Sequence, residues 1–422
     1  MYQSLELFPG ITLRCIRDRR FKQGALSIQF LRQMRREEAA LNALLPAVLL
    51  RGCQSCPDLK QIIHRLDDLY GASVSAMVRR IGDYQTTGFY CGFMEDRFAM
   101  DGDAILAPMV AFAGELLLQP LMEDGGFCRE FVESEKRNLI SAIESQRSDK
   151  RAYAAGKLLE IMCREDSFGI PRLGEATQVE KIDYQNLYAH YEKVLSESLV
   201  ELFYVGLADL ETVAQAVRPI FGKLPRRVTT LPPQTPFQTC PGSHETECQE
   251  IAQGKLSLGF VTPITNQDPR FAAMQVANAV FGSGMTSKLF MQVREQMSLC
   301  YAIGSSYYGS KGILTVNAGI DTQKESAARE AILAQLVACQ TGDVSREELH
   351  AAKESMLSSL RSVYDSPSAM EAFFGVAAHS GLNRSLEEYA RQIRAVEVAD
   401  VMAAAKTVSL HSSFFLKGDN HG

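Results

Sequence analysis

The histidines are the residues to examine first, because a histidine can act as a base or as a metal ligand near neutral pH. The chain has seven histidines among its 422 residues, and no two of them lie within five residues of each other. The zinc motifs HExxH and HxxEH are therefore absent from the sequence. No GxSxG nucleophile elbow and no Walker A loop occurs either. The sequence thus carries none of these hydrolase or nucleotide-binding motifs.

Cysteines are the second source of chemistry. Cys53 and Cys56 have the CxxC spacing of metal or redox sites, but a structural zinc site uses four ligands and no second CxxC occurs. Cys240 and Cys248 flank His244 in a proline-rich stretch. We expect both arrangements to be coincidental, and the ten cysteines to be reduced and mostly buried. An enzyme that uses such a thiol remains an alternative.

The charge of the chain limits its partners. The formal net charge is −6, and basic residues are interspersed with acidic ones without a polybasic tract. Nothing here favours binding to nucleic acid or to an anionic membrane. No apolar stretch approaches the ~20 residues of a membrane-spanning helix, and the N-terminus lacks the pattern of a signal peptide. We expect a cytoplasmic protein without membrane insertion.

A proline-rich segment divides the chain. Residues 224–247 hold five of the 15 prolines, which disfavour both helix and sheet. The segment predicts a semi-rigid linker between an N-terminal domain, residues 1–223, and a C-terminal domain, residues 248–422. Each part has the size of an ordinary domain.

The two parts resemble each other. Leu26–Phe30 alternates between apolar and polar residues like a half-buried strand, and Leu256–Phe260 does the same in the second part. Further along, the offset between matching positions becomes smaller, so that Asp149 corresponds to Asp365. Strands and long amphipathic helices keep their order throughout. The pattern predicts an internal duplication of an α+β unit in which helices pack on a sheet.

The segment from Phe281 to Asp321 is the most informative. It predicts a helix end, a glycine loop (Gly282-Ser283-Gly284), a second helix over 287–296, and then two strands joined by a glycine turn. Arg294 and Tyr301 lie seven residues apart, at the helix end and the strand start.

This segment resembles the second domain of the insulinase/pitrilysin-type zinc peptidases, which include the mitochondrial processing peptidases. The matching motifs are Gly282-Ser283-Gly284-Met285, Ser287-Lys288-Leu289-Phe290, Arg294-Glu295 and Leu299-Cys300-Tyr301. The resemblance implies that Arg294 and Tyr301, beside the loop of Gly282 and Gly284, contact a bound peptide. It also implies two tandem copies of the sandwich, with helices on an antiparallel sheet, seen in LuxS and the mitochondrial processing peptidases.

The first domain departs from this family at its catalytic centre. Counting back from Arg51-Gly52, the two histidine positions of HxxEH are Ala43 and Ala47, and the glutamate position is Pro46. The third ligand position is Ala142. Alanine cannot bind zinc and proline cannot act as a base. The sequence therefore predicts no metal, no cofactor and no catalytic residue in this chain.

The resemblance implies a non-catalytic subunit. Such a subunit would pair, as a heterodimer, with a homologue that carries HxxEH and the zinc, and both would bind the peptide in a shared chamber. A homodimer is the other arrangement, and a purely structural subunit that touches no substrate is the alternative function. The segment RREEAALNALLPAVLLRG most resembles an inactive bacterial member linked to modification of elongation factor P.

Overall fold

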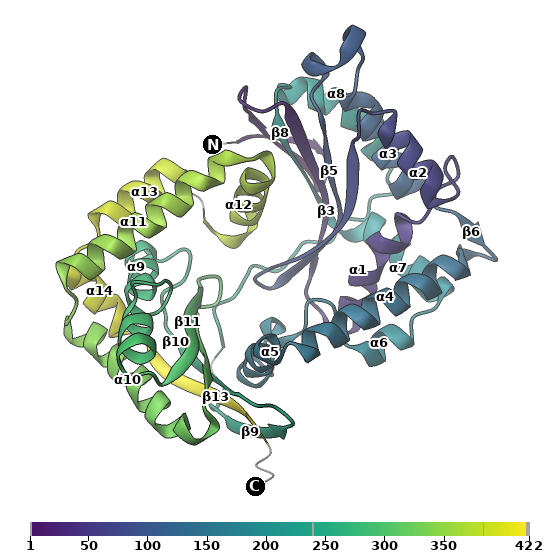
Figure 1. Ribbon diagram of the computed structural model, residues 1–422. Helices are drawn as coiled ribbons and strands as arrows, with labels where there is room; N and C mark the ends of the chain where they lie inside the picture. Colours follow the sequence, from purple (N-terminus) through teal and green to yellow (C-terminus); the bar gives the residue numbers. More distant parts are fainter. Residues whose placement is uncertain (1, 239, 383, 419–422) are drawn as a thin grey trace. The chain divides into compact units, whose positions relative to one another are not determined.

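The computed structural model describes residues 2–238, 240–382 and 384–418. Over these residues the chain forms two compact units, each built from separate segments (Figure 1). The first unit consists of Met1–Glu144, Ile170–Pro233 and Val363–His379, and the second of Ser145–Gly169, Gln234–Ser362 and Ser380–Gly422.

The units differ from the continuous domains that the proline-rich segment predicts. Residues 145–169 pack in the second unit although they precede the segment, and residues 363–379 pack in the first although they follow it. The segment itself is irregular over residues 225–238 and 240–243, and strand β9 (His244–Gln249) begins before its predicted end. A local composition signal marks where the chain leaves regular structure, but it carries no information about which unit a helix packs against.

The sheet of the first unit has, in the described part of the chain, the strand order β1–β2–β8–β3–β5–β4. The strands are β1 (Gln3–Phe8), β2 (Ile11–Arg17), β3 (Gln23–Gln33), β4 (Ser73–Ile81), β5 (Tyr84–Met94) and β8 (Leu199–Gly206). All neighbours pair antiparallel except β2 and β8, which are parallel. A separate short hairpin joins β6 (Met122–Glu123) to β7 (Gly126–Phe127).

The sheet of the second unit repeats this arrangement with one strand fewer among the described residues. Its order is β11–β12–β10–β13–β9, with β10 (Gly254–Val261), β11 (Cys300–Tyr308), β12 (Ile313–Ile320) and β13 (Ser409–Gly418). The pair β13–β9 is parallel and the other pairs are antiparallel. Strands β4, β5, β3, β8 and β2 thus correspond in order to β11, β12, β10, β13 and β9.

This correspondence agrees with the predicted duplication, and the predicted α+β class is confirmed. The sheets are antiparallel as predicted, except for one parallel pair in each, β2–β8 and β13–β9. A parallel pair forms because the chain returns to the sheet through helices before it adds β8 or β13.

Helices cover one face of each sheet and enclose the main cores. In the first unit they are α1 (Arg36–Leu49), α2 (Leu59–Asp67), α3 (Leu106–Leu118), most of α4 (Arg129–Ser148), α6 (Ala176–Glu180), α7 (Tyr184–Glu197) and α8 (Leu210–Phe221). In the second they are α9 (Phe271–Phe281), α10 (Glu325–Thr341), α11 (Arg346–Ser362), α13 (Leu386–Ala395) and α14 (Val398–Ala405). No helix in the described residues is long and apolar enough to cross a bilayer.

The start of α11 shows how local sequence places a helix. A capping box is present: the Ser345 amide donates to Glu348 Oε2 at 2.8 Å, and the Glu348 amide donates to Ser345 Oγ at 3.1 Å. Leu349 and Leu357 then face the core. The side chains thereby satisfy amides that a helix leaves without partners.

Each sheet is also covered on its second face by one helix that comes from the other half of the sequence. Helix α5 (Lys150–Met162) packs on β10 and β13 of the second unit, where Leu158 contacts Phe414 and Leu416. Helix α12 (Pro367–Ser380) packs in the first unit, where the buried Glu371 accepts hydrogen bonds from Ser27 and Arg79. Strand β3 is therefore buried on both faces rather than half-buried.

Candidate functional site

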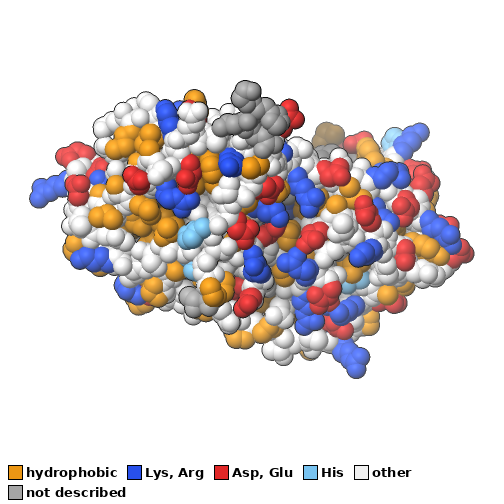
Figure 2. All heavy atoms as spheres, turned by 90° about the horizontal axis from the view of Figure 1, so that it is seen from below, with side chains coloured by type: hydrophobic (Ala, Val, Ile, Leu, Met, Phe, Trp, Pro, Cys, Tyr) orange, Lys and Arg blue, Asp and Glu red, His pale blue; other side chains and the backbone are white. Residues whose placement is uncertain are grey.

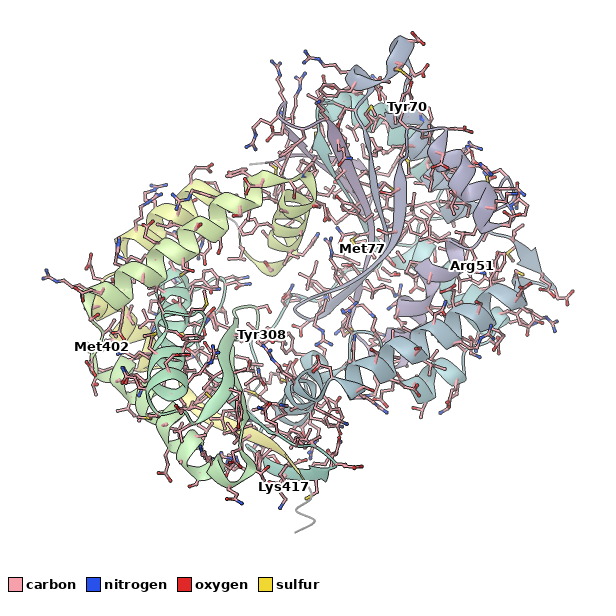
Figure 3. The ribbon with its side chains drawn as sticks, viewed as in Figure 1. Arg51, Tyr70, Met77, Tyr308, Met402 and Lys417 are labelled. Atoms are coloured by element: carbon pink, nitrogen blue, oxygen red, sulfur yellow. The ribbon has the colours of Figure 1, made fainter. Side chains whose placement is uncertain are left out.

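The positions that correspond to zinc ligands lie on α1 and α4. Ala43 and Pro46 are buried, Ala47 is half-buried and Ala142 is exposed. Arg51, labelled in Figure 3, follows the end of α1, and its NH1 lies 3.5 Å from Glu135 Oε1 on α4. None of the four side chains offers a zinc ligand, so these residues do not fit the metal that the fold family implies. Within the described residues, no group of three or more His, Cys, Asp or Glu side chains could hold a metal ion.

A buried polar network supports α1 next to these positions. Asn42 donates to Gln85 at 2.9 Å, and its side-chain oxygen lies 2.8 Å from His190 Nε2. Burial lowers the pKa of His190 to about 4, so the imidazole is neutral at pH 7. His190 is therefore a packing residue.

The cysteine pair is also structural. Cys53 and Cys56 are buried free thiols, and each backbone amide donates to the other residue's carbonyl, at 2.8 and 3.1 Å. The CxxC spacing here closes a tight turn. His244 Nδ1 lies 2.9 Å from Ser413 Oγ, on the parallel strand pair β13–β9, while Cys248 is exposed.

The glycine loop follows α9 in the second unit. A Cβ on Gly282 would lie 2.5 Å from Leu289 Cδ1 and 2.7 Å from Ser305 Oγ, so only glycine fits there without movement. Gly284 has a φ of +153°, which side chains rarely adopt, and open space lies beside it. The loop therefore leaves bare backbone at the surface.

Arg294 lies on the helix that follows the loop. The sequence predicted a helix here, and this segment, η4 (Leu289–Gln296), is a π-helix. Such helices are rare in proteins overall but are found frequently at functional sites. The Arg294 guanidinium stacks 4.5 Å from the ring centre of Phe290, and its Nε lies 3.6 Å from Glu295. The side chain is 38% exposed, so its fork remains accessible.

Tyr301 lies in a β-bulge at the start of β11. Cys300 pairs with Ile320 and Ala302 with Gly319, so Tyr301 is an extra residue without a partner on β12. A bulge of this kind redirects a side chain. The Tyr301 side chain is 67% exposed, whereas an aromatic side chain in a strand is usually half-buried.

The turn between Arg294 and Tyr301 brings them to one cavity. Ser298 has a φ of +50°, an uncommon conformation for a residue with a side chain. Arg294 and Tyr301 line a cavity of about 360 Å³ together with Asp321 and Lys324. A π-helix, a left-handed residue and a bulge thus follow one another within a short segment, and such irregularities cluster at functional sites.

A larger groove adjoins the same strand. Its volume is about 690 Å³, and its lining includes Gly282, Gly284, Phe290 and Ile303 from the loop, η4 and β11. The N-terminal turn of α5 forms another wall. Strand β11 is the edge of its sheet, so the groove exposes a strand that has a partner on one side.

Known proteins share this fold and resemble this sequence. Residues 181–356 match the family model of the peptidase M16 inactive domain. The chain is 28% identical over 409 residues to the probable inactive metalloprotease YmfF of Bacillus subtilis, and the match covers 97% of this chain and 96% of that protein. In sequence, the chain therefore resembles the inactive members of the M16 peptidase family over nearly its whole length.

Two solved structures have the same fold as this chain. A conserved protein from Enterococcus faecalis superimposes with a TM-score of 0.92 at 26% identity, covering 100% of this chain and 99% of that one. A peptidase M16 inactive domain from Pseudomonas fluorescens has a TM-score of 0.81 at 17% identity, covering 99% and 98% of the two chains. The predicted resemblance to the inactive branch is confirmed, while the roles of Arg294, Tyr301, Gly282 and Gly284 remain predictions.

Part of the surroundings of this site could not be predicted from the sequence. The spacing of Arg294 and Tyr301 was visible, but the groove wall from α5 was not, because α5 precedes the proline-rich segment. The bulge also has no signature in the segment Leu299-Cys300-Tyr301. The asymmetric pairing of Cys300 and Ala302 with β12 is what defines it.

Proposed function

We propose that this chain is the non-catalytic subunit of a two-subunit zinc peptidase. It binds the peptide substrate while a homologue with HxxEH supplies the zinc and the activated water. The observation that carries the proposal is the juxtaposition of Arg294 and Tyr301 at one cavity beside the exposed edge of β11. The basic and acidic side chains intermixed on the face in Figure 2 are consistent with a protein or peptide partner rather than a nucleic acid.

The edge of β11 can take a further strand. The Ser305 amide donates to the Gly282 carbonyl at 3.0 Å, on the side away from β12. Since backbone groups alternate along a strand, Ile303 directs its amide and carbonyl to that same side. An extended peptide in the groove would pair with Ile303 and prolong the short contact that Gly282 already makes.

Arg294 and Tyr301 suit the recognition of a peptide backbone. A guanidinium donates two parallel hydrogen bonds, which fit a carboxylate or a pair of carbonyl oxygens. The hydroxyl of Tyr301 can donate to the carbonyl of the bond that is cleaved, and such donors act most strongly where water is excluded. Glu295 and Phe290 hold the Arg294 side chain in place before the peptide arrives.

Co-expression tests the proposal. The full chain is produced with an HxxEH-bearing homologue from the same organism, and cleavage of a quenched fluorescent peptide library is measured. Arg294→Ala and Tyr301→Phe should each lower kcat/KM by about tenfold to a hundredfold, as the loss of one donor typically does. Arg361→Ala and Tyr70→Phe are matched controls, because Arg361 pairs with Glu354 on its own helix and Tyr70 binds Asp103 in the first unit.

The outcomes separate the two functions that the sequence leaves open. A stable complex whose cleavage is unaffected by both variants would favour a purely structural subunit. If the chain forms no complex with the homologue and does not change its cleavage, the subunit proposal is wrong. Homodimerisation of the chain alone is measured in the same series by light scattering.

A further inference from the structure

A second, smaller cavity adjoins the groove on β11. Its volume is about 150 Å³, several times the ~30 Å³ of a water molecule. It shares Arg151, Ile303 and Asn317 with the lining of the groove. A side chain of a peptide paired with Ile303 would therefore point toward this cavity.

Two cations face the cavity. Arg151 lies in the first turn of α5, and Lys255 lies on β10. Among the residues that the structure describes, neither forms an ion pair with a carboxylate, and Lys255 Nζ donates to the side chain of Gln253. Burial and the nearby Arg151 charge lower the pKa of Lys255, and the Asp149 carboxylate opposes this shift only in part. The site thus holds two positive charges whose mutual repulsion a bound anion would relieve.

Neutral polar groups complete the lining. Ser257 Oγ donates to Asn317 Oδ1 at 2.7 Å, which leaves the Asn317 amide group to donate elsewhere. Lys255 and Ser257 lie on the face of β10 opposite to Leu256 and Leu258, which belong to the main core. This polar face is the one that α5 covers.

The equivalent position in the first unit binds a carboxylate. Ser257 corresponds to Ser27 when the strands β10 and β3 are aligned, and Ser27 Oγ donates to the carboxylate of Glu371 at 2.7 Å. Glu371 belongs to α12, the counterpart of α5, and its equivalent is Ala155 when Asp365 is aligned with Asp149. In the first unit, this face of the sheet binds a carboxylate of its covering helix α12. In the second unit, the covering helix α5 has an alanine at the equivalent position and supplies no carboxylate there.

From this comparison we infer that the cavity between Arg151 and Lys255 binds a carboxylate of the peptide substrate, supplied by an acidic side chain. The inference rests on the proposed function, since it assumes that the peptide lies along β11. It specifies that the substrates are acidic near the segment that pairs with Ile303.

Two pools of fluorescein-labelled short peptides test the inference on the full chain. One position is Glu in the first pool and Gln in the second, and the other positions are randomised. Fluorescence anisotropy should show about tenfold tighter binding of the Glu pool, which is the affinity that one hydrogen bond to a charged group typically contributes. Lys255→Met and Arg151→Gln should each abolish this preference, whereas the exposed control Arg164→Gln should leave it intact.

The remaining outcomes distinguish the inference from the proposed function. Equal binding of both pools by the unmodified chain would overturn the carboxylate site while strand addition stands. If neither pool binds, peptide capture on β11 is wrong, and N-acetyl-glutamate amide then probes the cavity directly. A shift of the Lys255 Nζ resonance with this compound, absent with N-acetyl-glutamine amide, would support the site, and no shift would overturn it. An Ile303→Pro variant, which blocks strand pairing, should lose both pools but keep that resonance shift.

Discussion

The guanidinium of Arg79 holds the carboxylate of Glu371 through two hydrogen bonds, of 2.9 Å from NH1 and 2.8 Å from NH2. Glu371 is fully buried, and it also accepts hydrogen bonds from Ser27 and Gln29 of β3. Helix α12 is thereby fixed to the sheet of the first unit by a charge that has no contact with water. Arg79 therefore stabilises the fold through a buried partner rather than serving as a solvated surface charge.

Removal of Arg79 is expected to destabilise the first unit strongly. Arg79→Ala leaves the Glu371 carboxylate buried without its cation, which typically costs about 3–5 kcal/mol of unfolding free energy. Urea unfolding followed by circular dichroism measures the change. Arg361→Ala, at an exposed ion pair, serves as the control and should change stability by less than about 0.5 kcal/mol.

The double variant Arg79→Met with Glu371→Leu should recover most of this loss, since apolar residues of similar volume often replace a buried ion pair without cost. A double variant as unstable as Arg79→Ala alone would show that Ser27 and Gln29 need the carboxylate as much as Arg79 does.

Acid should destabilise the chain through His190. Burial lowers the pKa of His190 to about 4, whereas an unfolded histidine titrates near 6.5. Between these values the unfolded chain binds a proton that the folded chain does not, so stability falls as the pH falls from 6.5 to 4, by up to roughly 3 kcal/mol. His190→Gln keeps a donor for Asn42 but does not titrate, and should flatten the dependence of urea unfolding on pH in this window.

A second loss in acid is expected from Glu38 at lower pH. Burial opposes its ionisation, but hydrogen bonds from Arg32 and Lys193 prevail and lower its pKa to about 2. The stability that the Glu38 carboxylate contributes is complete above pH 4.5 and is lost as the pH falls toward 2. Glu38→Gln should therefore remove the contribution of this carboxylate below pH 4.5. Because the Glu38 charge also raises the pKa of His190, the variant should extend the loss through His190 to lower pH.

Alanine at Gly282 should damage the groove more than alanine at a neighbouring open glycine. The new Cβ would force Leu289 and Ser305 apart and weaken the hydrogen bond from the Ser305 amide to the Gly282 carbonyl. We expect a loss of about 1–3 kcal/mol, as for other overpacked sites, and weaker peptide binding. Gly304→Ala is the control, because its nearest neighbour would be 3.7 Å away.

Thiol reactivity should follow burial. Cys248 is exposed and Cys128 and Cys240 are partly so, while the other seven of the ten cysteines are buried. Burial raises the pKa of Cys91 to about 12, so it is protonated and unreactive at pH 8. Native titration with a disulfide reagent should label Cys248 first. Rapid labelling of Cys53 or Cys56, or loss of a cleavage activity on labelling, would instead favour an enzyme that uses thiol chemistry.

Much of the fold was predictable because its signals are local. The alternation in Leu256–Phe260, the capping box at Ser345 and the proline-rich segment each depend on residues close in sequence. Their repetition at a slowly changing offset predicted two similar sheets before any pairing was known. The degenerate positions Ala43 and Ala47 were equally predictable, because residue type alone decides whether a side chain can bind zinc.

What the sequence did not predict depends on distant contacts. Glu371 forms its hydrogen bonds with residues 292 to 344 positions away, and no local pattern marks it as buried. The π-helix around Arg294 packs against α10 and β11, and the bulge at Tyr301 is defined by the pairing of β11 with β12. The parallel pair β2–β8 likewise depends on which sheet edge the returning chain meets.

The crossed membership of α5 and α12 has a consequence for the history of the chain. In a single ancestral copy, no helix would have packed on the second face of the sheet. In a pair of identical copies, each copy would have supplied such a helix, the ancestor of α5 and α12, to the sheet of the other. Fusion of such a domain-swapped pair would give the present chain in one step. By the same logic, cleavage between residues 225 and 243 should release two fragments that complement each other, each incomplete without the helix that its companion carries.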